Sequence, residues 1–292
     1  MLASEVLAAL SVSPGETVVD ATLGRGGHAL MLAEAVSPGG TLVGLDRDPD
    51  NLEYAEKRLG QADGATVELH HANFAQLPSL LDGRQVDGLL ADFGVSTNQL
   101  LDEHRGLSFA HADAPLDMRL DPTLPDTAAD LLRYWPEKRI ADTIYQLGDE
   151  RFSRRIARRI VEARKQPGGL TTVGQLADLV RRSVPRPKGG RSKIDPATRT
   201  FMALRMAVNG ELDAISSLLS AIPQVLAPGG RAAIISFHSG EDRLVKNVFR
   251  ELASHGVVEL VTKKPIVPSE EEVERNPRSR SAKLRVVRRS AG

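Results

Sequence analysis

Glycines and acidic residues gather in the stretch DATLGRGGH, residues 20–28. Asp20 closes an apolar run, and Gly24, Gly26 and Gly27 follow within eight positions. Such glycines let the chain turn tightly after a strand and let ligand atoms approach the backbone, while the following helix offers free N–H groups. The stretch lacks the Lys-Ser/Thr ending of a P-loop, which argues against a nucleoside triphosphate. It also does not match the dinucleotide pattern G-x-G-x-x-G, so the glycines alone are a weak signal. A dinucleotide or another adenosine-bearing cofactor remains.

A second carboxylate, Asp46, ends the apolar run TLVGLD twenty residues after Gly26. Doubly wound folds place a carboxylate here for the ribose hydroxyls, which suits NAD and S-adenosylmethionine equally. Two features favour S-adenosylmethionine. Asp20 stands where it can contact an amino-acid moiety or organise the loop. Residues 1–100 hold 14 Asp+Glu against 5 Lys+Arg, which suits a cationic sulfonium better than an anionic pyrophosphate.

Two further strand ends carry candidate residues. Phe74 follows the third apolar run, where its ring can cover an adenine or simply join the core. Asp92 opens DFGVSTNQ, residues 92–99, directly after the fourth run. The carboxyl ends of parallel strands share one edge of the sheet, so we expect Asp92 near the bound cofactor.

Alternating segments position these residues. Strands are predicted over 16–22, 41–46, 66–74 and 86–94, with helices over 27–36 and 49–60, which indicates right-handed crossovers and a parallel sheet. After residue 100 the chain becomes helical, notably over 126–182, and a long helical pattern runs from Ala197 to about Val225. A buried strand is predicted over 227–239, and the last residues predict an edge strand. We therefore expect an α/β core, residues 1–103 and 201–292, with a helical insertion over 104–200.

Composition narrows the function classes. The 292 residues include no cysteine, which excludes disulfides, thiolate catalysis and thiolate-bound zinc and favours the cytoplasm. No apolar run is long enough for a membrane span, the N-terminus does not read as a signal peptide, and no metal-ligand spacing is present, so no catalytic metal is expected. Residues 151–199 hold 14 basic and 3 acidic residues, and residues 275–292 hold seven basic and none acidic. This asymmetry predicts a polyanionic partner, although a merely solvated basic surface is the alternative.

The sequence resembles the bacterial 16S ribosomal RNA cytosine-N4 methyltransferases, the RsmH or MraW family, over nearly its whole length. The resemblance is carried by DATLGRGGHA (20–29), GLDRDP (44–49), DFGVSTNQL (92–100), RGLSF (105–109), PLDMRLDP (115–122), DPATRTFMALRMAVNGEL (195–212), LAPGGRAAIISFHSGEDRLVK (226–246) and NPRSRSAKLR (276–285). It departs from the usual family residues at Phe93, Thr97, Asp195 and Gly240, none of which is a cofactor position.

The resemblance implies a class I, Rossmann-like, S-adenosylmethionine-dependent methyltransferase core whose inserted helical domain recognises RNA. It implies methyl transfer to the exocyclic N4 amine of a cytidine in 16S rRNA of the small ribosomal subunit, by a monomer or a homodimer. Carried over by position, the cofactor-binding residues are Gly26, Gly27, His28, Asp46, Phe74, Asp92 and Gln99.

Asp92 is the leading catalytic candidate, as an acceptor for an amine hydrogen or as a cofactor ligand. Asp117 and His238 are secondary candidates. Asp117 could instead pair with Arg119, and the acidic residues after His238 could cap a helix. The lack of cysteine argues against a covalent enzyme–base intermediate, which leaves direct attack by the amine.

A basic Gly/Pro-rich loop supplies the best candidates for RNA contacts. They are Arg186, Lys188, Arg191, Lys193 and Arg199. Three alternatives stay open: an NAD-dependent oxidoreductase, a non-enzymatic RNA-binding protein with a degenerate cofactor fold, and a methyltransferase acting on DNA or protein.

Overall fold

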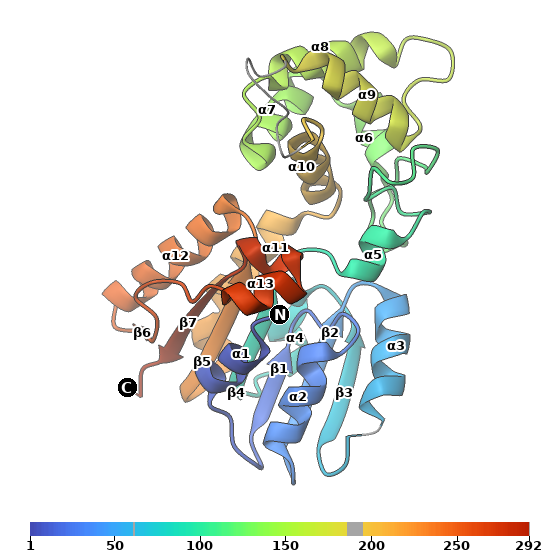
Figure 1. The fold of residues 1–292 in the computed structure, drawn as a ribbon. Helices are drawn as coiled ribbons and strands as arrows, with labels where there is room; N and C mark the ends of the chain where they lie inside the picture. The colour runs from blue at the N-terminus through green and yellow to red at the C-terminus, as the bar shows by residue number, and fades with distance from the viewer. Residues whose placement is uncertain (61, 186–194, 292) are drawn as a thin grey trace. The chain divides into compact units, whose positions relative to one another are not determined.

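The computed structural model describes residues 1–60, 62–185 and 195–291 (Figure 1). The contacts divide the chain into two compact units. Unit 1 comprises Met1–Gly94 and Leu212–Gly292, and unit 2 is Val95–Glu211. Among the described residues, no helix combines the length and apolarity needed to cross a lipid bilayer.

A seven-stranded sheet organises unit 1 in the order β3-β2-β1-β4-β5-β7-β6. Neighbouring strands are parallel except where β7 pairs antiparallel with both β5 and β6. The strands are β1 (Thr17–Asp20), β2 (Thr41–Asp46), β3 (Thr66–His71), β4 (Val86–Asp92), β5 (Leu226–Ser236), β6 (Val258–Leu260) and β7 (Lys283–Arg289).

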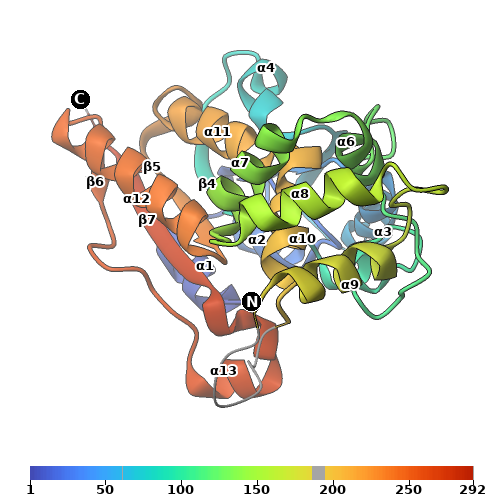
Figure 2. The same cartoon turned by 90° about the horizontal axis from the view of Figure 1, so that it is seen from above.

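Helices cover both faces of this sheet (Figures 1 and 2). One apolar cluster joins it to α1 (Ala3–Leu10), α2 (Gly27–Val36) and α3 (Pro49–Leu59). The other joins it to α4 (Leu77–Leu81), α11 (Glu211–Val225) and α12 (Ser239–Ser254). Val18 lies in the first cluster and Val19 in the second, and both are fully buried, because successive strand residues face opposite sides of the sheet.

The predicted strands and helices of residues 16–94 are present, with ends that differ by a few residues. β3 stops at His71, and Phe74 begins the short 3₁₀ helix η1 (Phe74–Gln76), which Asn73 caps. The predicted C-terminal edge strand is wrong, because β7 lies inside the sheet and β6 forms its edge. The acidic run before β7 forms the short helix α13 (Glu270–Arg275), followed by the 3₁₀ helix η2 (Pro277–Ser281).

The long helix predicted from Ala197 to Val225 is also wrong, because the chain breaks into α10 (Thr198–Val208) and α11 at Asn209–Gly210. Gly210 has a φ of 59°, a left-handed conformation that ends a helix and that glycine adopts without a Cβ clash.

Unit 2 is helical over its described residues and has an apolar core of its own, built from residues between Ala114 and Leu204. Its helices are α5 (Thr97–Leu101), α6 (Ala128–Tyr134), α7 (Glu137–Gly148), α8 (Ser153–Ala163), α9 (Val173–Ser183) and α10. Phe201 and Leu204 of α10 belong to this core, which is why the contacts group residues 201–211 with the helical unit rather than with the sheet.

Candidate cofactor and catalytic site

Asp46 at the end of β2 holds the glycine loop in place. Its Oδ2 accepts a hydrogen bond from the backbone N–H of Gly24 at 2.7 Å and one from Asn51 Nδ2 at 3.2 Å, and its Oδ1 accepts from the N–H of Asp48 at 2.8 Å. Burial nevertheless raises the pKa of Asp46, and the two backbone hydrogen bonds act against that rise. A carboxylate offers about four acceptor positions, so with three occupied about one remains for a ribose hydroxyl.

Two glycines let the loop turn into α2. Gly24 and Gly26 have φ values of 51° and 72°, in the left-handed region that favours glycine. Gly26 caps α2 without a side-chain hydrogen bond. Gly27 opens the helix, and a Cβ added to it would meet no atom within 4 Å. The first N–H groups of α2 therefore lie at the carboxyl edge of the sheet, next to Asp46.

Thr22 connects the ends of β1 and β4. Its backbone N–H donates to Asp20 Oδ1 at 3.1 Å, and its Oγ1 accepts from the backbone N–H of Asp92 at 2.6 Å. One carboxyl oxygen of each aspartate, Asp20 Oδ2 and Asp92 Oδ1, is buried and has no hydrogen-bond partner in the described structure. Two neighbouring strands thus bring two partly unsatisfied carboxyl groups to one edge.

Burial sets the protonation of both groups. It raises the pKa of Asp20 to about 7, against hydrogen bonds from Thr22 that lower it. It also raises the pKa of Asp92 to about 7, and the positive amino group of Met1 acts in the opposite direction. Each carboxyl is therefore divided between its neutral and ionised forms near neutral pH.

His28 stands in the first turn of α2 beside Asp92. Its Nε2 lies 2.7 Å from the carbonyl oxygen of Met1, and its Nδ1 lies 3.8 Å from Asp92 Oδ2. Burial lowers the pKa of His28, so the ring is neutral at pH 7. Because a carbonyl only accepts, Nε2 carries the proton, and Nδ1 is left as an acceptor facing the carboxyl group.

Phe74 lies next to Asp46 across the sheet, where the N–H of Ala72 donates to the Asp46 carbonyl at 3.0 Å. Its half-buried ring packs 5.6 Å from that of Phe93, and the guanidinium of Arg47 stands 5.9 Å from its centroid. A side chain placed here can flank a base attached to a ribose held by Asp46, although the ring also contributes to the core.

His238 is engaged in capping α12. Its Nδ1 accepts from the N–H groups of Gly240 and Glu241, and its Nε2 lies 3.0 Å from Glu241 Oε1. The buried Glu241 in turn accepts from the N–H of Phe237 at 2.9 Å. Both ring nitrogens thus face protein atoms, which favours the structural interpretation of His238 over a catalytic one.

Two other predicted site residues belong to unit 2. Gln99 is 4% exposed and accepts from the N–H of Ser96 at 2.9 Å, which caps α5. Asp117 forms two 2.8 Å contacts with the guanidinium of Arg119, which also donates to the carbonyl of Leu124. That pairing is the structural role foreseen for Asp117, and both of its carboxylate oxygens are occupied.

Of the five basic candidates for RNA contacts, the structure describes only Arg199. Arg186, Lys188, Arg191 and Lys193 lie outside the described residues. Arg199 is exposed on α10, and its Nη1 donates to the carbonyl of Asp149 at 3.3 Å.

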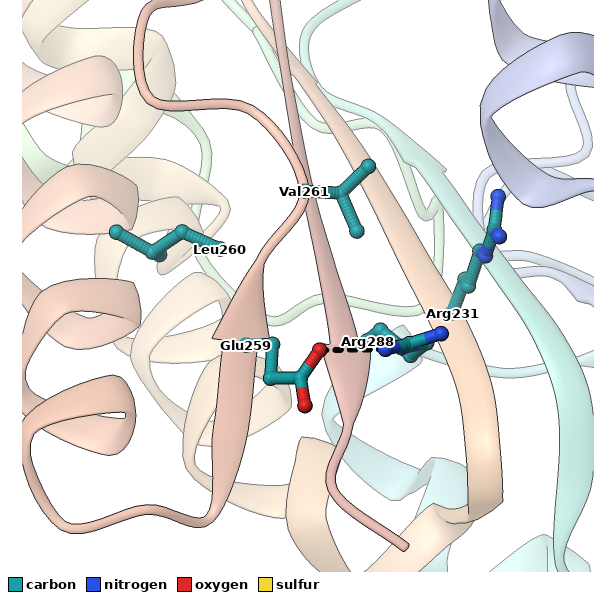
Figure 3. Close-up of a pocket in the computed structure, with 5 residues that line it drawn as sticks. All are labelled: Arg231, Glu259, Leu260, Val261 and Arg288. Carbon is teal, nitrogen blue, oxygen red and sulfur yellow. Dashed lines mark hydrogen bonds and ion pairs between the residues drawn. The ribbon is translucent and has the colours of Figure 1, made fainter.

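A surface hollow of about 230 Å³ lies elsewhere in unit 1, on β5, β6 and β7 (Figure 3). Arg231, which lines it, pairs with Gly88 of β4, whereas the candidate site lies at the carboxyl ends of the strands. Arg288 and Glu259 pair at 2.6 Å across the hollow, and Arg231 donates to the carbonyl of Ala9. Among the described residues, no group of three or more His, Asp or Glu side chains could hold a metal ion.

Comparisons with known proteins give this arrangement a context. The model of the MraW methylase family matches residues 1–290. The chain belongs to the MraW methylase family. A protein of Acidobacterium capsulatum named ribosomal RNA small subunit methyltransferase H is 46% identical over 293 residues, 98% of this chain and 96% of that protein. A protein of the same name from Sorangium cellulosum is 48% identical over 295 residues, 100% of this chain and 90% of that protein.

Membership of the MraW methylase family confirms the class I methyltransferase core and decides between the two cofactors that the residues left open, in favour of S-adenosylmethionine. The described residues fit that cofactor. The unsatisfied, buried carboxyl oxygens of Asp20 and Asp92 suit a ligand with a positive sulfonium and an ammonium group. Asp46 and the glycine loop provide the acceptors and the close backbone approach that a ribose and an amino-acid end require.

Sequence reasoning missed Thr22 and Asn51, which donate hydrogen bonds to the carboxylates of Asp20 and Asp46 in this candidate site. The position of Thr22, between Asp20 and the first glycine, was the available signal. Its hydrogen bond to Asp92 spans seventy positions and could be recognised only in the folded chain.

Proposed function

We propose that this chain transfers a methyl group from S-adenosylmethionine to the exocyclic N4 amine of a cytidine in 16S rRNA of the small ribosomal subunit, in the cytoplasm. The observation that carries the proposal is the pair of buried, unpartnered carboxyl oxygens, Asp20 Oδ2 and Asp92 Oδ1, at the carboxyl edge of the sheet in a member of the MraW methylase family. The names of its relatives, ribosomal RNA small subunit methyltransferase H, support rRNA of the small subunit as the substrate.

Each residue at the sheet edge has a proposed task. Asp46 accepts hydrogen bonds from the ribose, and Phe74 flanks the adenine. The backbone at Gly26 and Gly27 approaches the amino-acid end, with His28 and Gln99 completing the contacts. The bound cofactor supplies an electrophilic methyl group on a positively charged sulfur.

Asp92 is proposed to act on the attacking amine. The N4 lone pair is delocalised into the cytosine ring, so the amine is a poor nucleophile. A carboxylate that accepts one of its hydrogens returns electron density to nitrogen and then takes up the proton. A pKa of about 7 suits this exchange, because a general base works best with a pKa near the operating pH. Holding the amine in line with the methyl group supplies roughly 7–11 kcal/mol at best.

RNA contacts are proposed for the loop candidates Arg186, Lys188, Arg191 and Lys193 and for Arg199. Arginine and lysine side chains neutralise the phosphates of nucleic acids and release their counterions. The target base must leave any stack to reach the cofactor, at a cost of a few kcal/mol.

Tritiated methyl transfer to small subunits from cells lacking this protein tests the proposal. Nucleoside analysis is expected to show label on N4-methylcytidine. Label on another base or atom would contradict the assignment, and no label on any RNA would support the non-enzymatic alternative.

Calorimetry with Asp46→Asn tests the cofactor contacts separately. Losing charge-assisted hydrogen bonds of about 1.5–3 kcal/mol is expected to weaken S-adenosylmethionine binding roughly 10- to 100-fold. Asp63→Asn, at an exposed loop position of the same unit, is the control and should bind the cofactor as the wild type does. If Asp46→Asn binds S-adenosylmethionine as tightly as Asp63→Asn does, Asp46 does not contact the ribose.

A further inference from the structure

The exposed side of α8 carries a row of arginines that have no hydrogen-bond or ion-pair partner among the residues the structure describes. Arg154, Arg155 and Arg158 are exposed, while Ile156 and Ile160 of the same helix are fully buried in the core of unit 2. None of the three guanidinium groups makes a hydrogen bond or ion pair with the described residues. The remaining stretch 186–194 contains no acidic residue that could pair with them.

The like charges of this row do not stabilise α8. Arginines three and four positions apart on α8, such as Arg155 with Arg158 and Arg154 with Arg158, are neighbours on the helix surface, and each like-charge pair destabilises the helix by about 0.2–0.5 kcal/mol. The buried apolar face holds α8 in place instead. A surface that keeps a repulsive row of cations fits a ligand that supplies several negative charges.

Exposed tyrosines stand near both ends of α8. Tyr145 is 59% exposed at the end of α7, and the turn after it includes Asp149, whose carbonyl accepts from Arg199.

At the other end of α8, Arg164 donates to the carbonyls of Leu132 and Trp135 at 3.2 and 2.7 Å. These bonds fix that end of the helix beside Tyr134, which is 66% exposed. α8 lies beside α7 and α9, and α7, α8 and α9 can be followed in Figure 2.

We infer that the exposed face of α8, with Arg154, Arg155, Arg158, Tyr134 and Tyr145, is a second RNA-binding surface, distinct from the basic loop that precedes α10. The arginines contact successive phosphates, and the tyrosines stack on unpaired bases at the two ends. An eleven-residue helix is about 16 Å long, enough to follow several nucleotides of a single strand. Arginine-lined surfaces with aromatic stacking platforms bind single-stranded RNA in this way. The inference rests on the proposed RNA substrate.

The test compares two triple variants of the full chain. Arg154, Arg155 and Arg158 are changed to Gln, which favours helix about as well as Arg. The control changes Arg250, Lys263 and Lys264 of unit 1 to Gln; these are exposed basic residues, and the overall charge change is the same. Binding of small-subunit RNA is measured by filter retention between 50 and 300 mM salt, S-adenosylmethionine binding by calorimetry, and methyl transfer by kinetics.

The α8 variant is expected to bind RNA on the order of ten-fold or more weakly, and its dependence of log affinity on log salt should flatten by about 2, at about 0.7 per lost phosphate contact. The KM for RNA should rise, while kcat at saturating RNA and cofactor affinity stay unchanged. Tyr145→Ala should weaken binding without changing the salt slope. RNA affinity equal to the wild type, or an equal loss in the control, would overturn the inference. If the wild-type protein methylates no RNA, the proposed function fails, and the binding comparison still decides the α8 surface.

Discussion

We expect the affinity for S-adenosylmethionine to depend on pH through Asp20 and Asp92. Burial raises the pKa of each to about 7, well above the 3.8 of an ordinary aspartate, so the folded protein holds these protons where the unfolded chain has lost them. Their contribution to the free energy of unfolding therefore falls as pH rises from about 4 to 7. A cation bound beside them favours their ionised forms, so S-adenosylmethionine binding should release protons and tighten as pH rises through 7.

Calorimetry at pH 6, 7 and 8, in buffers with different ionisation enthalpies, measures both effects. Asp92→Asn should remove part of the proton release and flatten the pH dependence, whereas Asp63→Asn should leave it unchanged. Affinity that is constant with pH, or protons taken up on binding, would show that the cofactor does not contact these carboxyl groups.

Thr22 positions Asp92 without reaching the reacting atoms in our proposal. Thr22→Val keeps the shape of the side chain but leaves the partly buried N–H of Asp92 without its acceptor, which costs about 1–3 kcal/mol of stability. We expect kcat to fall about ten-fold, with little change in the KM for cofactor or RNA. Thr22→Ser, which keeps the hydroxyl, should restore kcat. A loss in the valine variant that serine does not rescue would point to packing rather than to the hydrogen bond.

The elements around the glycine loop could be predicted because their signals are local. Apolar runs mark the strands, and Pro49 and the glycines mark where helices begin and turns occur. The wrong prediction for the last strand came from long-range pairing, which the sequence does not show. β7 enters the sheet between β5 and β6 because Val286 and Val287 are fully buried there, which a short basic strand does not reveal in sequence. The Asn209–Gly210 break was hidden because apolar periodicity continues on both sides of it.

For the candidate site, too, the positions with local signals could be predicted and those that depend on the folded chain could not. Asp46 could be predicted from its spacing to the glycines. The capping role of His238 depends on N–H groups exposed only once α12 has formed. The pairing of Asp117 with Arg119 could be foreseen, because the two residues are only two positions apart in the sequence.

Gly27, at the start of α2, allows a role in ligand binding to be tested apart from a role in folding. Gly27 has ordinary negative φ, and a Cβ there would meet no protein atom within 4 Å, so Gly27→Ala should leave the midpoint of thermal unfolding unchanged or slightly raised. If the cofactor approaches the backbone there, its affinity should drop several-fold or more. Normal affinity in a normally folded variant would exclude Gly27 from the cofactor contacts.

The whole chain separates its charges between two units. The acidic carboxyl edge lies in unit 1, while residues 151–199, where basic residues dominate, belong to unit 2. This division matches the proposed binding of a small cationic ligand by unit 1 and of a polyanion by unit 2.

We expect unit 2 to fold without unit 1. All buried residues of the unit 2 core come from residues 95–211, so that segment has what an independently folding domain requires. Expressed alone, it is expected to show a helical circular dichroism spectrum, to unfold cooperatively and to bind small-subunit RNA with a steep salt dependence, but not to bind S-adenosylmethionine. Ile156→Ala should lower its unfolding free energy by about 2–5 kcal/mol, since it removes a fully buried side chain from that core. A segment that unfolds without cooperativity, or that folds but does not bind RNA, would place the RNA contacts in unit 1 or require both units together.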